Sequence, residues 1–329
     1  MKIDNLKEVL KSEPKYRLKQ AQTAVLKDFI DDWQKVSVLP LAWRQKLNKE
    51  CPLEIRAETL LSKKNDSLKI QLTLEDGLKV ESVLMRHIDG RNTVCVSSQV
   101  GCALACEFCA TGKMGFKRNL NPWEIVEQVM FFSRYLKKEG GKITNIVFMG
   151  MGEPFLNYDN VIEAIKILND KEGLNIGARH ISISTIGIIK GIEQLSKENL
   201  QLNLAVSLHA SNNELRTKII PINKKYPLEQ ILKTVDDYIK KTKRKVMFEY
   251  LLIKGVNDSD DCAFELAKLM KKPLYFLNLI LYNPTNTFKP SSTERIKKFK
   301  EVLKKSGVRF SQRYRFGQDI KAACGQFHC

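Results

Sequence analysis

Three cysteines in the segment 101–109 have the spacing that most directly indicates chemistry. Cys102, Cys106 and Cys109 form a C-x3-C-x2-C pattern, which places three thiols in one short loop with no fourth ligand beside them. A tetrahedral zinc site normally takes a fourth ligand nearby. An iron–sulfur cluster held by three thiolates instead leaves one iron open, where a small molecule such as S-adenosylmethionine can bind and be reduced. The spacing therefore favours a reactive 4Fe-4S centre over a structural metal site.

The same thiols admit other interpretations, which the sequence leaves open. They can be buried small apolar side chains, or three ligands of a zinc site completed by His87, Cys262 or Cys329. A zinc site would indicate a non-catalytic RNA-binding protein, and such a protein would show no absorbance from an iron–sulfur cluster. A radical enzyme that acts on a protein, such as an activase that makes a glycyl radical, would share the cysteine loop. It would explain neither Cys95 nor Cys324, nor the charge of the chain.

The charge of the chain indicates a polyanionic partner. It carries 55 Lys and Arg against 37 Asp and Glu, a formal net charge of +18, and basic runs such as 240–245 concentrate it. RNA is the natural candidate, although Lys-rich helices are often only solvated faces. No stretch is long and apolar enough to span a membrane, and the N-terminus has no apolar signal-peptide core. Because the eight cysteines are not spaced like a secreted disulfide framework, we expect a monomeric cytoplasmic protein with no membrane association.

The 329-residue chain is long enough for one large domain and a small one. Helical periodicity predicts amphipathic helices over 15–29 and 41–49. Two alternating segments, 69–74 and 78–85, flank the sequence Glu-Asp-Gly at 75–77, which is a good hairpin turn. We therefore divide the chain into a helical N-terminal accessory domain that binds RNA (1–62), a β-hairpin connection (63–90), and a core with a C-terminal segment (91–329).

Beyond residue 93, apolar runs alternate with helical patterns. One helix is marked by Asn121 as its N-cap, Pro122 at its first position and Glu124 in its first turn. Strands joined by helices in this order are parallel, so we predict an α/β fold with a partial barrel of about six βα units. In such barrels the functional residues lie at the carboxyl ends of the strands. The expected strands lie near 94–97, 143–149, 181–185, 202–208, 246–252, 274–281 and 308–312.

Five separated stretches resemble those of a known family. They lie at 95–102, 148–154, 182–185, 207–209 and 319–326. Together they are similar to the radical SAM RNA adenosine methyltransferases, the RlmN and Cfr group, and most similar to the RlmN branch. The resemblance implies a partial (βα)6 radical SAM barrel, a 4Fe-4S cluster, S-adenosylmethionine and an RNA substrate. It also implies a reducing electron-transfer protein such as flavodoxin or ferredoxin.

The resemblance further implies the ligands of the cluster and of S-adenosylmethionine. Cys102, Cys106 and Cys109 would hold the cluster. Considered alone, Gly152 lets backbone approach a ligand and Glu153 can accept from an ammonium group, but a tight turn with a surface Glu would have the same sequence. His209 can equally be a core histidine with no contact to a cofactor. By resemblance the cofactor contacts are Gly152, Glu153, Ser184, Ser207, Leu208, His209 and Asn283.

Methylation of an adenine ring carbon requires unusual chemistry, because that carbon offers no lone pair to attack S-adenosylmethionine. The resemblance implies that one S-adenosylmethionine methylates Cys324 and that a radical made from a second takes hydrogen from this methyl. The carbon radical then adds to the ring. Cys95 is the resolving thiol, which breaks the protein–RNA bond by forming a disulfide with Cys324, and Glu81 accepts the ring proton. The alternatives for Cys324, Cys95 and Glu81 are a mobile tail thiol, a packed strand cysteine and an exposed hairpin carboxylate, respectively.

The two branches of this family differ in the carbon that they methylate. The carbon is C2 in the housekeeping branch, which acts on 23S ribosomal RNA and transfer RNA, and C8 in the antibiotic-resistance branch. Pro154 after Glu153 and the run 101–104 look like the housekeeping branch. We therefore expect a dual-specificity C2 methyltransferase, with a Cfr-like C8 enzyme as the alternative. Cys51 and Cys262 are expected to be structural.

Overall fold

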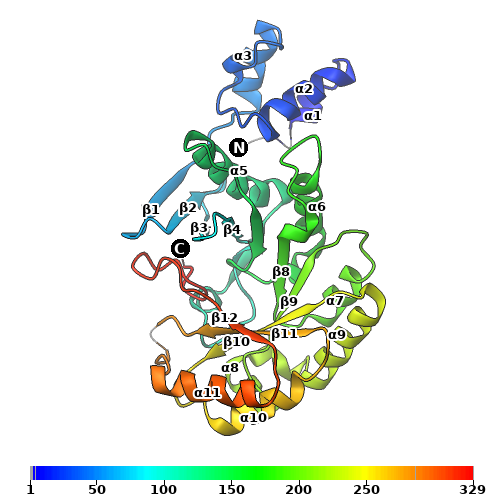
Figure 1. The fold of residues 1–329 in the computed structure, drawn as a ribbon. Helices are drawn as coiled ribbons and strands as arrows, with labels where there is room; N and C mark the ends of the chain where they lie inside the picture. Colours follow the sequence, from blue (N-terminus) through cyan, green and yellow to red (C-terminus); the bar gives the residue numbers. More distant parts are fainter. Residues whose placement is uncertain (1–2, 4, 286, 329) are drawn as a thin grey trace.

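A ten-stranded sheet forms the frame of the protein (Figure 1). The computed structural model describes residues 3, 5–285 and 287–328. The strand order is β1-β2-β3-β4-β7-β8-β9-β10-β11-β12, and every neighbouring pair from β4 onward is parallel. The strands of this sheet are β1 (Ala57–Leu61), β2 (Ser67–Thr73), β3 (Lys79–Arg86), β4 (Asn92–Val96), β7 (Asn145–Phe148), β8 (Ile181–Thr185), β9 (Asn203–Ser207), β10 (Val246–Leu252), β11 (Tyr275–Leu281) and β12 (Phe310–Gln312).

The parallel strands follow one another in chain order, so helical crossovers join successive strands. In the described chain β4 to β11 supply six parallel strands and the short β12 extends the edge, which confirms the predicted α/β fold and partial barrel. No helix in the described residues is both long and apolar enough to cross a membrane. The helices are α1 (Leu6–Val9), α2 (Lys15–Leu26), α3 (Leu41–Glu50), α4 (Ala110–Lys113), α5 (Pro122–Lys138), α6 (Tyr158–Asn169), α7 (Ile189–Leu195), α8 (Asn213–Ile219), α9 (Leu228–Thr242), α10 (Asp260–Leu269) and α11 (Thr293–Lys305).

The predicted hairpin is present and belongs to the same sheet as the barrel. Strands β2 and β3 pair antiparallel, and β3 pairs antiparallel with β4, the first barrel strand. In the connecting turn the carboxylate of Asp76 accepts from the Leu78 amide at 3.1 Å, and Gly77 has φ 81°. Left-handed backbone of this kind favours glycine. The hairpin therefore places its buried side chains beside the barrel strands.

The N-terminal helices lie at one end of the molecule (Figure 1). Helix α2 ends before the expected residue 29, and the chain leaves it with Phe29 in left-handed backbone (φ 54°). Trp33 is buried, and its indole Nε1 donates to the carbonyl of Cys51 at 2.7 Å. Cys51 is itself fully buried, as expected for a structural cysteine. The guanidinium of Arg134 on α5 donates to two backbone carbonyls of the N-terminal region, which ties this region to the core.

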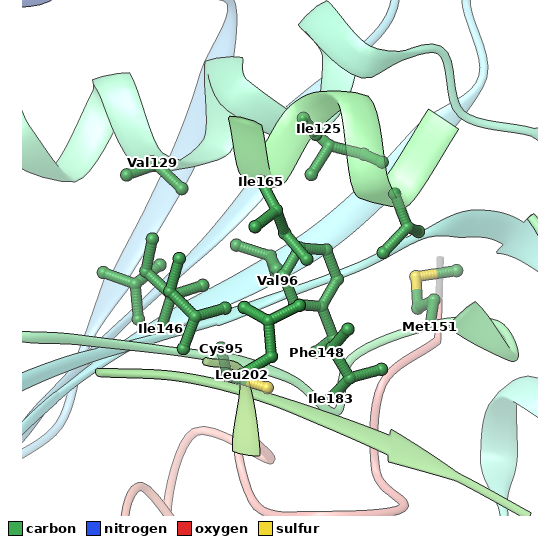
Figure 2. Close-up of a cluster of buried hydrophobic side chains, with 14 of the residues drawn as sticks. Cys95, Val96, Ile125, Val129, Ile146, Phe148, Met151, Ile165, Ile183 and Leu202 are labelled. Carbon is green, nitrogen blue, oxygen red and sulfur yellow. The ribbon is translucent and has the colours of Figure 1, made fainter. Parts of the chain in front are cut away.

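Helix α5 begins where its sequence predicts. The side chain of Asn121 accepts from the Glu124 amide at 2.9 Å, and the Glu124 carboxylate accepts from the Asn121 amide at 2.9 Å, which is a capping box. The buried face of α5, including Ile125 and Val129, packs against the buried side chains of β4 and β7 (Figure 2). Cys95 of β4 belongs to this cluster. The helix thus covers the strand that leads into the cysteine loop.

Two short strands that the sequence pattern did not predict flank the cysteine loop. Strand β5 (Gln99–Gly101) precedes the loop and pairs antiparallel with β6 (Phe116–Asn119), which follows it. Gly101 has φ 75°, and a Cβ at this position would lie 1.8 Å from the carbonyl oxygen of Gly115. Only glycine allows this approach. The pair of strands therefore closes the base of the loop.

Candidate active site

The carboxyl ends of the parallel strands and the cysteine loop surround one cavity, the cysteine-loop cavity. Its wall includes the three loop thiols and residues from the ends of β7, β8, β9 and β10. Parallel strands present their carboxyl ends at a common edge, which is why residues far apart in the sequence meet here. The predicted site residues that line this cavity are Cys102, Cys106, Cys109, Gly152, Glu153, Ser184, Ser207, His209 and Cys324.

A second cavity lies on the other side of Cys324, and we call it the arginine cavity. It is lined by Arg91, Arg313 and Arg315 and by both Cys95 and Cys324. Cys324 therefore contributes to the walls of both cavities.

Two predicted cofactor contacts do not lie where the resemblance suggested. Leu208 is fully buried and lines neither cavity; its amide donates to the Glu249 carbonyl at 3.0 Å and its carbonyl accepts from Arg216. Asn283 lines the arginine cavity, and its Nδ2 donates to the Cys324 carbonyl at 3.3 Å. Its Oδ1 is buried and has no hydrogen-bond partner among the described residues. Asn283 therefore holds the backbone of Cys324 and keeps one acceptor for a ligand.

The cysteine loop brings its three thiols close enough to influence one another. Burial raises the pKa of the Cys106 thiol well above its usual range, and the nearby thiols of Cys109 and Cys102 raise it further. Burial likewise raises the pKa of Cys102 to about 12. A metal or cluster that binds here must displace these protons, because thiolates are the ligands. Until a metal or cluster binds, the thiols of Cys102 and Cys106 therefore hold their protons strongly.

The donor set fits a cluster better than a single ion. In the described part of the chain, no group of three Cys, His, Asp or Glu side chains converges as one metal ion would require. Thiolates of a cubic cluster each bind a different iron, so thiols around one cavity wall suit it. Of the distant ligands considered for zinc, His87 lines the arginine cavity and Cys262 lies on α10. Cys329 lies outside the described residues.

Glu153 is a buried carboxylate held at both oxygens. Oε1 accepts from the Phe155 amide at 3.0 Å and Oε2 from the Ile186 amide at 2.8 Å. Burial raises the pKa of Glu153 to about 7, against the two N–H donors, which favour the ionised form. The alternative of a tight turn with a surface Glu is therefore wrong. Gly152, with φ 94°, lets the backbone pass over Gln99, where a Cβ would lie 2.5 Å from that side chain.

His209 is a neutral imidazole in left-handed backbone (φ 58°). Its Nδ1 accepts from the Leu251 amide at 3.1 Å, so the ring proton belongs on Nε2. Burial and the nearby Arg216 lower the pKa of His209 to about 3. The ring meets Phe108 edge-on at 4.9 Å between centroids. The residue is thus both a satisfied core histidine and part of the cavity wall.

The serines that end β8 and β9 face each other across neighbouring strands. Ser184 Oγ and Ser207 Oγ are 3.3 Å apart, and both line the cysteine-loop cavity. Hydroxyls can donate or accept, so this pair suits polar edges such as carboxylate or ribose oxygens. Leu208 follows the last residue of β9, and its amide and the His209 amide both donate to the Glu249 carbonyl, so the chain leaves the strand here with the Leu208 side chain fully buried.

Cys324 lies in a tail segment docked on the cysteine loop. The amide of Ala110 donates to the Gly325 carbonyl at 2.8 Å, and the hydroxyl of Thr111 donates to the Phe327 carbonyl at 2.7 Å. Gly325 has φ 82°. These contacts hold the tail against α4, directly after Cys109, and the alternative of a mobile tail thiol has no support in this arrangement.

Cys95 and Cys324 form a pair of thiols beside the half-buried Arg313. Burial raises the pKa of Cys95, and a charge on Cys324 raises it further. Cys324 is accessible from the cavities, but desolvation by the surrounding protein still raises the pKa of its thiol, whereas Arg313 acts to lower it. The two thiols share the arginine cavity, with no disulfide between them. A resolving thiol and a carrier thiol would need this proximity.

Glu81 is not the exposed hairpin carboxylate that was the alternative for it. Only 2% of its surface is accessible, Oε1 is 2.8 Å from the Lys69 ammonium, and Oε2 accepts from the His328 amide at 3.0 Å. The Lys69 ammonium also lies 3.5 Å from the Lys321 carbonyl. Glu81 lines neither cavity. It contacts the tail directly only after Cys324, at His328, whereas its partner Lys69 contacts the tail before Cys324, at Lys321.

An ion pair between the half-buried Arg313 and the buried Glu249 was not predicted from the sequence. Arg313 Nη2 is 2.9 Å from Glu249 Oε1, and Asn278 donates to the same oxygen at 3.0 Å. Burial lowers the pKa of Arg313, but Glu249 and the two thiols outweigh this and raise it. The available signal was Glu249 itself, a charged residue inside an otherwise apolar strand. Buried charges of this kind need a partner.

Comparison with known proteins agrees with this architecture. Residues 96–267 match the family model of the Radical SAM superfamily, the class that the partial barrel and three-cysteine loop define. "Probable dual-specificity RNA methyltransferase RlmN" of Dictyoglomus thermophilum is 46% identical over 328 residues, which cover 98% of this chain and 94% of that protein. "Ribosomal RNA large subunit methyltransferase N" of Nitrosopumilus maritimus is 50% identical over 274 residues, 81% of this chain and 78% of that protein.

The fold is also that of a solved methyltransferase. The crystal structure of a radical SAM methyltransferase from Sphaerobacter thermophilus matches with a TM-score of 0.94 at 41% identity, and covers 99% of this chain and 97% of that one. The chain belongs to the RlmN family of radical SAM RNA methyltransferases.

Proposed function

We propose that this RNA methyltransferase adds a methyl group to C2 of an adenine in 23S ribosomal RNA and in transfer RNA, with Cys324 as the methyl carrier. The supporting observation is that Cys324 lines both the cysteine-loop cavity and the arginine cavity. A methyl group must pass from S-adenosylmethionine to RNA, and a residue at the boundary of two cavities can receive it from one side and deliver it to the other.

The cysteine-loop cavity is the proposed place of cluster and cofactor. Cys102, Cys106 and Cys109 would hold a 4Fe-4S cluster, which supplies the electron that cleaves S-adenosylmethionine. Flavodoxin or ferredoxin is the proposed electron donor. Glu153 accepts from the ammonium group of S-adenosylmethionine, and the remaining contacts in this cavity come from the Ser184–Ser207 pair, Gly152 and His209. Asn283 would reach the cofactor from the arginine cavity through its free Oδ1. Leu208 lines neither cavity and both of its backbone groups are hydrogen-bonded within the protein, so its proposed role is to hold Ser207 and His209 in place.

Cys324 first acts as a nucleophile. Its thiol loses a proton and its sulfur takes the methyl group of one S-adenosylmethionine, which leaves as S-adenosylhomocysteine. Because burial raises the pKa of Cys324, the Arg313 guanidinium supports this step by favouring the thiolate. A hydrogen would later be removed from the methyl by the radical derived from a second S-adenosylmethionine, and the carbon would bond to the adenine ring. The unpaired electron of this adduct would then return to the proposed electron-transfer protein, which closes the electron balance.

Cys95 and Glu81 complete the reaction. The Cys95 thiol loses its proton and attacks the sulfur of Cys324, so that a disulfide forms and the bond from that sulfur to the RNA-bound carbon breaks. The electron pair of the broken bond stays with the carbon, which takes up a proton and becomes the methyl group. An external dithiol then reduces the disulfide. Glu81 accepts the proton that leaves C2, and its carboxyl group lies 2.8 Å from the Lys69 ammonium in a buried setting.

The test is the identity of the methylated nucleoside. RNA from cells that lack the enzyme is incubated with reconstituted protein, S-adenosylmethionine and a reductant, then digested and separated by chromatography with mass detection. We expect 2-methyladenosine, none with Cys324→Ala, and unchanged yield with Cys262→Ala as the matched control. A product of 8-methyladenosine would assign the Cfr-like reaction instead. A colourless zinc protein that makes no methyladenosine would overturn the proposal.

A further inference from the structure

An exposed row of aromatic rings stands at the arginine cavity and has no role in the proposed methyl transfer. The rings of Tyr314 and Phe316 meet edge-on at 4.8 Å between centroids, and Phe316 meets the His87 ring in the same way at 4.8 Å. His87 is fixed in turn by a 3.0 Å hydrogen bond between its Nε2 and the Thr93 hydroxyl. Tyr314 is nonetheless 58% exposed. The rings of His87 and Phe316 therefore hold the row in position, and the ring of Tyr314 at its other end is exposed to solvent.

The same cavity wall is positively charged. Arg91, Arg313 and Arg315 line it, and its lining includes no Asp or Glu. Arg313 is neutralised by Glu249, and Arg91 pairs with Asp89. Arg315 has no hydrogen-bond or ion-pair partner among the described residues, although it is half buried. A free guanidinium beside an exposed aromatic ring is a combination that suits one phosphate and one base of a nucleic acid.

We propose that Tyr314, Phe316 and Arg315 form a subsite for the nucleotide next to the methylated adenine. The proposal rests on the proposed function, since it takes Cys324 to be the point that the target base must reach. An adenine whose ring carbon is attacked must leave its stack, and its neighbour then loses a stacking partner. The exposed ring of Tyr314 replaces that partner, and Arg315 binds the phosphate between the two nucleotides. Phe316 and His87 hold Tyr314 in place from behind.

Binding to single-stranded RNA tests the subsite independently of catalysis. The probes are a fluorescent oligoadenylate and an oligomer of the same length made of abasic ribose phosphates. Tyr314→Ala should weaken binding of oligoadenylate by about tenfold, because one base–aromatic stack is lost. It should leave binding of the abasic oligomer unchanged. Tyr314→Phe should bind like the native protein, and Arg315→Ala should weaken both probes and reduce the salt dependence by about one phosphate contact.

Phe264→Ala is the matched control, because Phe264 is an exposed aromatic residue on α10 (52% accessible) that lines neither cavity. The subsite is overturned if Tyr314→Ala binds oligoadenylate as the native protein does, or if it loses affinity equally for the abasic oligomer.

Methylation separates a failure of the subsite from a failure of the proposed function. In the holoenzyme, Tyr314→Ala should lower kcat/KM for RNA about tenfold and leave reductive cleavage of S-adenosylmethionine without RNA unchanged. If the native protein makes no methyladenosine but its binding of oligoadenylate depends on Tyr314, the subsite stands and the proposed function fails. If Tyr314→Ala methylates RNA at the native rate, the subsite is wrong and the proposed function stands.

Discussion

The ammonium of Lys69 on β2 lies 2.8 Å from the carboxylate of Glu81 on β3, with both side chains almost fully buried. The two residues are diagonal neighbours on one face of the hairpin, two residues apart in register, because Lys69 pairs with Val83 and Glu81 with Gln71. A buried ion pair of this kind stabilises little by its presence, but the removal of one partner is costly.

Lys69→Met should therefore destabilise the protein by about 3–5 kcal/mol, because it leaves the Glu81 carboxylate buried without its cation. Urea unfolding measures the loss. The double variant Lys69→Met with Glu81→Gln removes both charges and should recover a large part of the stability. It should not methylate RNA, because the proposed proton acceptor is absent. A double variant as unstable as Lys69→Met alone would show that the pair is not coupled.

Cys95→Ala should trap RNA on the protein. Its Cys324 would still be methylated and would still bond to the adenine, but no thiol would remain in the arginine cavity to break that bond. A band that shifts on a denaturing gel and collapses with nuclease measures the adduct, and mass spectrometry places it on the Cys324 peptide. Cys324→Ala should form no adduct yet still cleave S-adenosylmethionine. Full turnover by Cys95→Ala would contradict the two-cysteine mechanism.

Glu153 should make the binding of S-adenosylmethionine depend on pH. Its pKa, raised to about 7 by burial, means that the carboxyl is protonated below this pH and ionised above it. An ammonium group pairs with the ionised form, so affinity should be full above about pH 7 and fall by up to about tenfold for each pH unit below it. Calorimetry on the anaerobic holoenzyme measures this. Glu153→Gln should bind weakly with no such dependence, and a flat native profile would refute the assignment.

The basic run 240–245 should contribute less to RNA binding than Arg315 does. It joins the end of α9 to the start of β10, so it lies at the amino edge of the parallel strands, and Lys240 is partly neutralised by Asp237. We expect neutralisation of Lys240, Lys241 and Lys243 to reduce the salt dependence of RNA binding by less than one unit for each lysine. Filter binding across a salt series measures the slope. A loss of about three units would place the RNA on this face.

The sequence predicted the barrel well because its strands are buried apolar runs whose limits are set locally. The strands expected over 181–185 and 246–252 coincide with β8 and β10. The limits of α2 and the pair β5–β6 were missed, since these depend on backbone conformation at single residues such as Phe29 and Gly101. Local patterns carry little information about such positions.

The site was predictable wherever strand topology alone determines position. Residues at the ends of β7, β8 and β9 were expected together and line one cavity. Leu208 was included through resemblance, and its fully buried side chain lines neither cavity. The ion pairs Lys69–Glu81 and Arg313–Glu249 could not be derived from local pattern. The first joins diagonal neighbours on β2 and β3, and the second joins β10 to a residue that follows β12, so both depend on the folded sheet.

Because the tail is docked on α4, the position of Cys324, the proposed methyl carrier, depends on the structure of the cysteine loop. The helix begins at the residue after Cys109, and its first two residues hold the carbonyls of Gly325 and Phe327. Any disturbance that unwinds the loop, such as oxidative loss of its iron, also removes the support of Cys324. On the proposed mechanism the two hydrogen bonds therefore act as an interlock, because Cys324 keeps its support for methyl transfer only while the cysteine loop is folded.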